Sequence, residues 1–411
     1  MKKTKFLLGA LLVIGLLVGY NWSSIERLIH VKSLFDADKI VYNFSHMDEV
    51  LFSSDLPRSG TVDEWQYDLK PLPETYADRD IIRTTANMLV KLQTTALVVV
   101  KDGTVVFEDY YKDTDKDDLR ISWSMSKSFV SALTGLAVKN GDIESIDDPV
   151  TKYAPSLKGS AYDGVPLRDV LNMASGLDFD EDYLDPSSDI NQMGTVLALG
   201  GSLDDFAADQ NAIARPSGTA WHYCSIDTHV VSMVLRAATG TTLQQYFIDN
   251  LWSKIGASAD AKYSTDGDGN AFALGGLNMR TKDYALFGEL IRNKGKRDDV
   301  EIIPADWIEE STSVSAPPAE NVDPAAQDVF RYGYQWWIPP HADGEFFAVG
   351  VYGQYIYINP KAGIVIAKNA AHREFMGADE TGDSYMSQNI TLFRGIAAHY
   401  SDWQHSPETK D

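Results

Sequence analysis

The stretch Ser122-Trp123-Ser124-Met125-Ser126-Lys127-Ser128-Phe129 carries most of what the sequence says about architecture and chemistry. It opens a predicted helix over residues 124–139 that stops at Asn140-Gly141, where glycine allows the left-handed turn that closes many helices. Ser124 and Lys127 are three residues apart, so their side chains share one helix face, about one turn from each other. The spacing indicates a serine nucleophile beside a lysine base.

This pairing makes chemical sense if the lysine is partly buried. Desolvation would lower the pKa of Lys127, so that a neutral amine could take the proton of the Ser124 hydroxyl. The free N–H groups at the start of the helix would favour negative charge developing beside Ser124. Ser-x-x-Lys should nevertheless occur by chance roughly once or twice in a chain this long. A capped helix with an exposed lysine is therefore the competing interpretation.

A second segment, residues 216–225, leads into a helix predicted over residues 226–239. Its Tyr223 could pass the proton from Ser124 and Lys127 to a leaving group. A tyrosine in such a loop is more often a packed aromatic with a satisfied hydroxyl. The neighbouring Cys224 is the single cysteine of the chain, and we interpret it as a small buried residue.

A third segment, residues 347–354, lies at the end of a predicted strand. Two glycines three residues apart, Gly350 and Gly353, either mark a bulge or let a ligand approach the backbone closely. In the second case the N–H of Val351 would complete an oxyanion hole with that of Ser124.

Outside these segments, β-rich runs lie towards both ends of the chain. Residues 96–100 and 105–111 flank an Asp-Gly turn, which predicts a hairpin. A second hairpin is predicted from residues 346–349, 355–358 and 364–368. Helices are predicted over 281–293 and 385–400. This order favours one sheet built from both ends of the chain, with a helical domain inserted in its middle.

Composition excludes several classes of protein. The 411 residues are 44% hydrophobic and 23% charged, which is typical of a globular chain. A formal net charge of −23 would repel a phosphate backbone, so we expect no nucleic-acid partner. The eight histidines show no metal-ligand spacing, and the acidic loop 266–270 has Ala271 and Leu277 where a calcium loop needs Gly and Glu. We therefore expect neither a metal nor a cofactor.

The N-terminus has the layout of an export signal or a membrane anchor. Lys2, Lys3 and Lys5 precede an apolar run from Phe6 to Tyr20 that contains no charge. No small-x-small cleavage site follows this run, so we expect residues 1–22 to stay uncleaved, with residues 6–22 in the inner membrane and the rest in the periplasm. The alternative is secretion after cleavage.

With these three segments, the chain resembles the serine β-lactamase, penicillin-binding-protein and esterase superfamily over about residues 85–400. The three motifs of that superfamily are similar to residues 124–127, 223–225 and 348–350. Supporting stretches lie at residues 167–177 and 274–283. The resemblance implies the catalytic interpretation of Ser124, Lys127 and Tyr223, with an oxyanion hole from Ser124 and Val351.

The resemblance also implies a fold. We expect an α/β fold of the α+β type, in which an antiparallel sheet is flanked by N- and C-terminal helices and carries an inserted, mainly helical domain. A lead-in over residues 23–84 would precede a hydrolase domain at 85–400, and a tail would follow at 401–411. Within the hydrolase domain, the sheet subdomain would comprise about 85–120 and 275–400, and the helical one about 121–274.

Two residues differ from the β-lactamase motifs and indicate another branch of the superfamily. Ser225 stands where β-lactamases usually carry Asn, and Ala348 stands where they carry the Lys or His that helps to hold a carboxylate. Tyr-x-Ser with this glycine pattern resembles instead the 6-aminohexanoate-dimer (nylon-oligomer) hydrolases and their carboxylesterase relatives. Tyr183 resembles a tyrosine of that branch that lies over the site, although a surface tyrosine in an acidic loop is an equal alternative.

The sequence therefore predicts a serine hydrolase that cleaves esters or linear amides through an acyl-serine intermediate. We expect Ser225, Tyr183, Gly350 and Tyr352 to contact the substrate. Aromatic residues near the motifs could line an apolar acyl pocket, although core packing is the favoured role for at least half of them: Trp123, Trp221, Trp336, Trp337 and Tyr352. A β-lactamase or D-alanyl-D-alanine carboxypeptidase, and a sensor that acylates and stalls, remain alternatives. The sequence does not indicate an oligomeric state.

Overall fold

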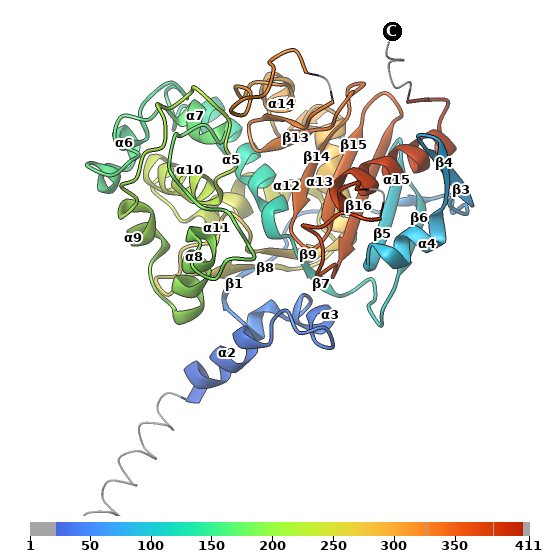
Figure 1. Cartoon of the computed structure of the whole chain (residues 1–411), viewed down its shortest axis with the longest axis horizontal. Coiled ribbons are helices and arrows are strands. Elements are labelled where there is room, and N and C mark those ends of the chain that lie inside the picture. The colour runs from blue at the N-terminus through green and yellow to red at the C-terminus, as the bar shows by residue number, and fades with distance from the viewer. Residues whose placement is uncertain (1–21, 327, 381, 406–411) are drawn as a thin grey trace, which may run out of the picture.

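A computed structural model describes residues 22–326, 328–380 and 382–405. Its centre is an eight-stranded sheet (Figure 1). Neighbouring strands are antiparallel except at one edge, where β2 pairs with β6 in parallel. In spatial order the strands are β12 (Arg331–Gly333), β13 (Trp336–Ile338), β14 (Phe346–Gly350), β15 (Gln354–Asn359), β16 (Ile364–Ala370), β5 (Thr94–Lys101), β6 (Thr104–Tyr110) and β2 (Gln66–Tyr67).

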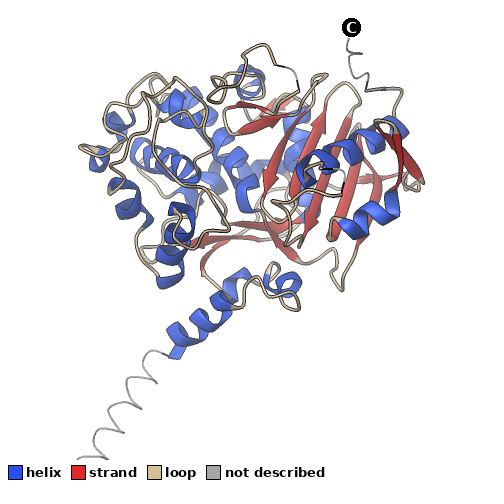
Figure 2. Cartoon of the chain, in the orientation of Figure 1, coloured by secondary structure: helices blue, strands red, loops and turns tan. Residues whose placement is uncertain are grey.

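Helices cover both faces of this sheet (Figure 2). On one face, α4 (Thr85–Lys91) and α15 (Tyr385–Tyr400) pack on alternate strand residues such as Leu97 and Ile366. On the other face, α5 (Ser126–Asn140) and α13 (Thr281–Arg292) pack on the intervening residues such as Val98. Because successive strand side chains point to opposite faces, a sheet covered twice needs continuous apolar strands, and β5 is one.

A second sheet of four strands lies beneath the first (Figure 1). Its order is β1 (Phe52–Leu56), β8 (Ala261–Thr265), β9 (Leu277–Arg280) and β7 (Leu119–Ile121). β7 runs directly into the short 3-10 turn η2 (Trp123–Met125) and then α5. The strand thereby fixes the point at which the catalytic motif begins.

The part of the chain between α5 and β8 is mainly helical. Its longest helix, α10 (Ser225–Thr239), packs on α5, and both helices end at a left-handed glycine, Gly240 and Gly141. The smaller elements of this part are α6 (Val150–Tyr153), η3 (Pro155–Leu157), α7 (Leu167–Leu171), α8 (Asp189–Leu199), α9 (Leu203–Ala208), α11 (Leu243–Phe247), the π-helix η4 (Ile248–Trp252) and α12 (Ser253–Ile255).

The remaining elements lie towards the two ends of the chain. They are α2 (Trp22–Lys32), α3 (Ile40–Asn43), η1 (Met47–Glu49), the hairpin of β3 (Thr75–Asp78) and β4 (Ile81–Thr84), the pair β10 (Lys296–Arg297) and β11 (Val300–Glu301), and α14 (Ala305–Ser311). The lead-in is more structured than its sequence predicts, because β1 and β2 each join a sheet.

The predicted fold class, both hairpins and the four long helices agree with this architecture. One detail differs: α5 begins at Ser126, so Ser124 lies in the preceding 3-10 turn. The predicted subdomain boundaries stay predictions. The predicted anchor lies outside the described residues except for Trp22, and among the residues that the structure describes no helix is both long and apolar enough to cross a bilayer.

Candidate active site

The first two predicted catalytic residues meet at the start of α5. Nζ of Lys127 lies 3.2 Å from Oγ of Ser124, and it also lies 3.2 Å from Oγ of Ser225 and 3.1 Å from the carbonyl oxygen of Leu274. Lys127 is 1% exposed. Burial lowers the pKa of Lys127 to about 8, against a smaller opposing effect from Glu181. The lysine is thus a buried base within reach of a serine hydroxyl, and the exposed-lysine interpretation is wrong.

Glu181 holds the other side of this cluster. Its carboxylate accepts the backbone N–H of Ser225 at 2.9 Å, and it also accepts the hydroxyl proton of Ser225. The hydroxyl of Tyr183 donates to the same carboxylate at 2.7 Å. Tyr183 therefore lies at the site, tied to it through Glu181.

Tyr223 lies beside the same lysine. Nζ of Lys127 is 5.4 Å from the centroid of the Tyr223 ring. Burial, and next the charge of Glu181, raises the pKa of Tyr223, while hydrogen bonds to Ser124 and Ser225 act in the opposite direction. The side chain is a protonated phenol at neutral pH. It can donate a proton next to the Ser124 hydroxyl.

The end of β14 packs directly against the turn that carries Ser124. A Cβ atom at Gly350 would lie 2.3 Å from the carbonyl oxygen of Ser122 and 3.1 Å from the backbone nitrogen of Ser124. The next residue, Val351, follows the last residue of the strand. Gly350 is therefore required for close approach of the two backbones, as expected for an oxyanion hole built from Ser124 and Val351.

We expect Gly350→Ala to lower kcat about 100-fold, since the added methyl group would push the strand away from Ser124 and displace one oxyanion donor. Steady-state kinetics with an ester substrate measures the loss. Gly194→Ala in α8 is the matched control, because a Cβ there meets no atom within 4 Å. A folded Gly350→Ala variant with wild-type kcat would contradict this account of the oxyanion hole.

Two groups of aromatic side chains include residues of the site. In the first group, the centroid of the Tyr223 ring lies 5.4 Å from that of Trp337 and 6.4 Å from that of Trp221. In the second group, the centroid of the Tyr352 ring lies 4.6 Å from that of Phe375, which in turn lies 5.9 Å from that of Tyr183. Aromatic rings near a reacting group favour apolar groups on the substrate.

The prediction that Trp336 could line an apolar acyl pocket is wrong. It is 1% exposed and stacks on Phe287 of α13, on the inner face of the sheet. Successive residues of β13 point to opposite faces, so Trp337 reaches the site and Trp336 does not. Cys224 is buried as expected, and burial raises the pKa of its thiol.

Two acidic residues of the site were missed by sequence reasoning. Glu181 lies two positions before Tyr183, and the resemblance of Tyr183 to a tyrosine of the nylon-oligomer hydrolases is the signal that points to this loop. Asp227 lies two positions after Ser225, is fully buried, and accepts a hydrogen bond from the hydroxyl of Tyr162 at 2.7 Å. Burial raises the pKa of Asp227 to about 7.

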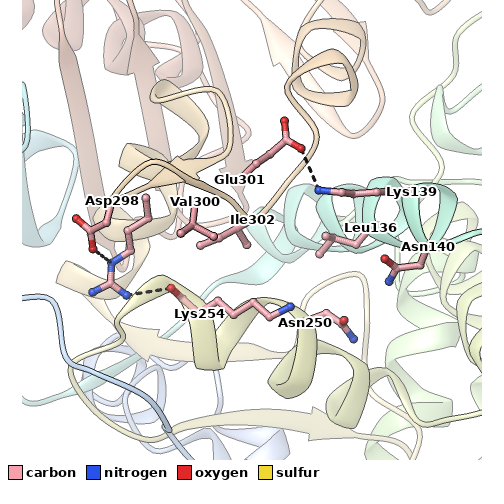
Figure 3. Close-up of a pocket in the computed structure, with 10 residues that line it drawn as sticks. Leu136, Lys139, Asn140, Asn250, Lys254, Asp298, Val300, Glu301 and Ile302 are labelled. Atoms are coloured by element: carbon pink, nitrogen blue, oxygen red, sulfur yellow. Dashed lines mark hydrogen bonds and ion pairs between the residues drawn. The ribbon is translucent and has the colours of Figure 1, made fainter.

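A separate surface cavity of about 390 Å³ lies at the other end of α5 (Figure 3). Lys139 and Glu301 form an ion pair of 3.0 Å at its edge. At 1.5 Å per residue, Lys139 is about 20 Å along the helix from Ser126. This cavity is therefore not part of the site around Ser124.

The chain is similar to known hydrolases in sequence. A family model described as Beta-lactamase matches residues 82–385. The 6-aminohexanoate-dimer hydrolase of Paenarthrobacter ureafaciens is 29% identical over 283 residues, which cover 67% of this chain and 72% of that protein.

Solved structures give the same picture of the fold. A structure described as "Putative 6-aminohexanoate-dimer hydrolase from Bacillus anthracis" superposes with a TM-score of 0.75 at 23% identity, over 89% of this chain and 95% of that one. The D-stereospecific amidohydrolase from Streptomyces has a TM-score of 0.56 at 14% identity, over 76% and 98% of the two chains. At these identities the likeness establishes a shared fold.

Proposed function

This chain belongs to the β-lactamase family and is a hydrolase of that family, and we propose that it cleaves esters or linear amides through an acyl intermediate on Ser124. The observation that carries the proposal is the buried amine of Lys127, 3.2 Å from Oγ of Ser124. In this mechanism Ser124 attacks the carbonyl carbon while Lys127 takes its proton. The N–H groups of Ser124 and Val351 stabilise the oxyanion.

The hydrogen bonds around Lys127 set the direction of proton transfer. A neutral amine has two N–H donors and one lone pair. The carbonyl oxygen of Leu274 can only accept, and Ser225 gives its own hydroxyl proton to Glu181. Both oxygens therefore take N–H donors from Lys127, so the lone pair faces the hydroxyl of Ser124. Glu181 and Ser225 act as positioning residues in this scheme.

Tyr223 then delivers a proton to the leaving group. Its protonated phenol lies beside both Ser124 and Lys127, so it can donate as the leaving oxygen or nitrogen departs and be reprotonated from the lysine. Water afterwards releases the acyl group and regenerates Ser124.

The substrate class follows from what surrounds the serine. Ala348 is 1% exposed and has no charged group. It stands where β-lactamases carry the Lys or His that helps to bind a carboxylate of the substrate. The aromatic rings grouped with Tyr223 and with Tyr352 favour apolar groups on the substrate. The 6-aminohexanoate-dimer hydrolase relative supports a linear amide as one such substrate. A small ester or amide without a required carboxylate fits these features.

A panel of substrates tests the proposed function. We expect kcat/KM for a short-chain nitrophenyl ester or a linear amide to exceed that for a cephalosporin or a D-alanyl-D-alanine peptide by about 100-fold or more. Preference for the cephalosporin or the peptide would reject the proposal. A lasting penicillin adduct without turnover of any substrate would identify a sensor instead.

The rate should depend on pH through Lys127. Only the neutral amine can accept the serine proton, and burial lowers the pKa of this lysine to about 8. We therefore expect kcat/KM to rise with pH, about tenfold per unit below the midpoint, and to level off above about pH 8. A profile of kcat/KM for an uncharged ester measures this. A rate that increases as pH falls below the midpoint would contradict Lys127 as the base.

Glu181→Gln tests whether a neighbouring charge sets the midpoint of this pH profile. The charge of Glu181 is the leading effect that raises the pKa of Lys127, so its removal should move the midpoint to lower pH. Asp182→Asn removes the same charge from the exposed neighbouring position and should move it less. Equal shifts in the two variants would show a general charge effect rather than a local one.

A further inference from the structure

One residue next to each oxyanion donor has a left-handed backbone. Trp123, just before Ser124, has φ of +42°, and Tyr352, just after Val351, has φ of +63°. Bulky residues rarely adopt this region, and such a backbone persists only where the surrounding structure holds it. Something in the fold must therefore hold these two residues in place.

Two phenylalanines of the N-terminal lead-in contact both of them. The Phe35 ring stacks on that of Tyr352, at 4.8 Å between centroids and 17° between planes, and lies 6.0 Å from that of Trp123. The Phe44 ring meets Trp123 at 5.6 Å and Tyr352 at 5.3 Å, edge-on in each case. Phe35 and Phe44 also touch each other, at 6.3 Å. We call these two residues the phenylalanine clamp.

One backbone hydrogen bond joins the lead-in to the strand before the catalytic turn, and two side-chain hydrogen bonds fix the lead-in internally. The carbonyl oxygen of Phe44 accepts the N–H of Ile121, the last residue of β7, at 3.0 Å. The side chain of Asn43, which is 4% exposed, donates to the carbonyl oxygens of Ser33 and Leu34 at 3.0 and 3.1 Å. These bonds place Phe35 against Tyr352 and Phe44 against Trp123.

From these contacts we infer that the phenylalanine clamp positions the oxyanion hole. It bridges the end of β14 and the turn before α5, the two backbones that supply the N–H donors. The clamp lies before residue 82, where the family match begins, so the lead-in adds to the site from outside the matched region. This inference rests on the proposed function, because it assigns a role within the same reaction.

Phe35→Ala is the variant that tests the clamp. Phe35 is 39% exposed, so its loss should leave folding intact, whereas Phe44 is 3% exposed and belongs to the core. We expect kcat to fall about 10-fold with little change in KM, because the donors move without loss of a substrate contact. Binding of a trifluoromethyl ketone, whose tetrahedral adduct places an oxyanion in the hole, should weaken by a similar factor.

Phe52→Ala is the matched control, and Phe35→Tyr is the rescue. Phe52 lies on the same lead-in at 45% exposure but packs under the guanidinium of Arg27, so its removal should change neither kcat nor ketone binding. Phe35→Tyr keeps the stacked ring and should retain wild-type kcat. Thermal unfolding of each variant separates positioning from loss of structure.

Each outcome decides one claim. Wild-type kcat and ketone affinity in Phe35→Ala would overturn the clamp while leaving the proposed function intact, provided that wild-type turnover requires Ser124. A rise in KM alone would also overturn it and would make Phe35 a substrate contact. Equal losses in Phe35→Ala and Phe52→Ala would reduce the lead-in to a structural role. Absence of ester and amide turnover in the wild type would instead reject the proposed function.

Discussion

Replacing Ser124 by Ala should lower kcat/KM for ester or amide hydrolysis by about 10⁴-fold or more, because removal of a nucleophile from such a unit leaves only binding and the oxyanion hole. The half-buried Ser124 hydroxyl contacts Lys127, which retains two other hydrogen-bond partners. Stability should therefore change little. Steady-state kinetics and thermal unfolding on the same preparation measure the two effects.

Ser126→Ala is a sharp control for that variant. Oγ of Ser126 is buried and lies 2.6 Å from the hydroxyl of Tyr263 and 2.7 Å from the carbonyl oxygen of Ala273. Its loss should cost about 1 kcal/mol of folding free energy and leave the chemistry intact. The two variants thus have opposite signatures. Retention of more than about a tenth of wild-type activity in Ser124→Ala would refute the nucleophile.

Replacing Lys127 by Met should lower kcat/KM about 10³-fold, within the range contributed by a general base. Methionine has a similar length and no charge. Burial penalises the charged form of Lys127 and lowers its pKa to about 8, but removal of the amine also leaves the carbonyl oxygen of Leu274 without this donor. Because these two effects oppose each other, we expect the free energy of unfolding to change little. Loss of activity with little change in stability is the expected signature.

Lys139→Met is the matched control on the same helix. Lys139 pairs with Glu301 at the far end of α5, and its side chain is 38% exposed, so the substitution should leave kcat/KM unchanged. Full activity of Lys127→Met, with a pH profile like that of the wild type, would show that another group removes the serine proton.

Much of the fold and the centre of the site could be predicted from the sequence. Ser124 and Lys127 share one turn, and Tyr223 and Val351 lie in segments whose residue pattern matches the family, so local spacing sufficed for them. The family and the fold inferred from these motifs are confirmed. The catalytic roles of these residues stay predictions; in the structure Nζ of Lys127 lies 3.2 Å from Oγ of Ser124 and 5.4 Å from the centroid of the Tyr223 ring.

The rest of the site depends on contacts between distant segments. Glu181 is 44 residues from Ser225 in the chain and reaches it only because the loop before α8 folds over α10. Phe35 meets Tyr352 across more than three hundred residues, and nothing in the periodicity of the lead-in predicts that contact. Whether Trp336 or Trp337 lies near the site depends on which face of β13 packs on the core. A strand of three residues is too short for its sequence pattern to show this.

Labelling with a fluorophosphonate, followed by mapping of the modified peptide, tests the nucleophile most directly. The reagent phosphonylates an activated serine, so we expect a single modified residue, Ser124, in the wild type. The labelling rate should rise with pH through about 8 and be strongly reduced in Lys127→Met. Modification of a different residue, or no modification of a preparation that hydrolyses esters, would contradict the assignment of Ser124.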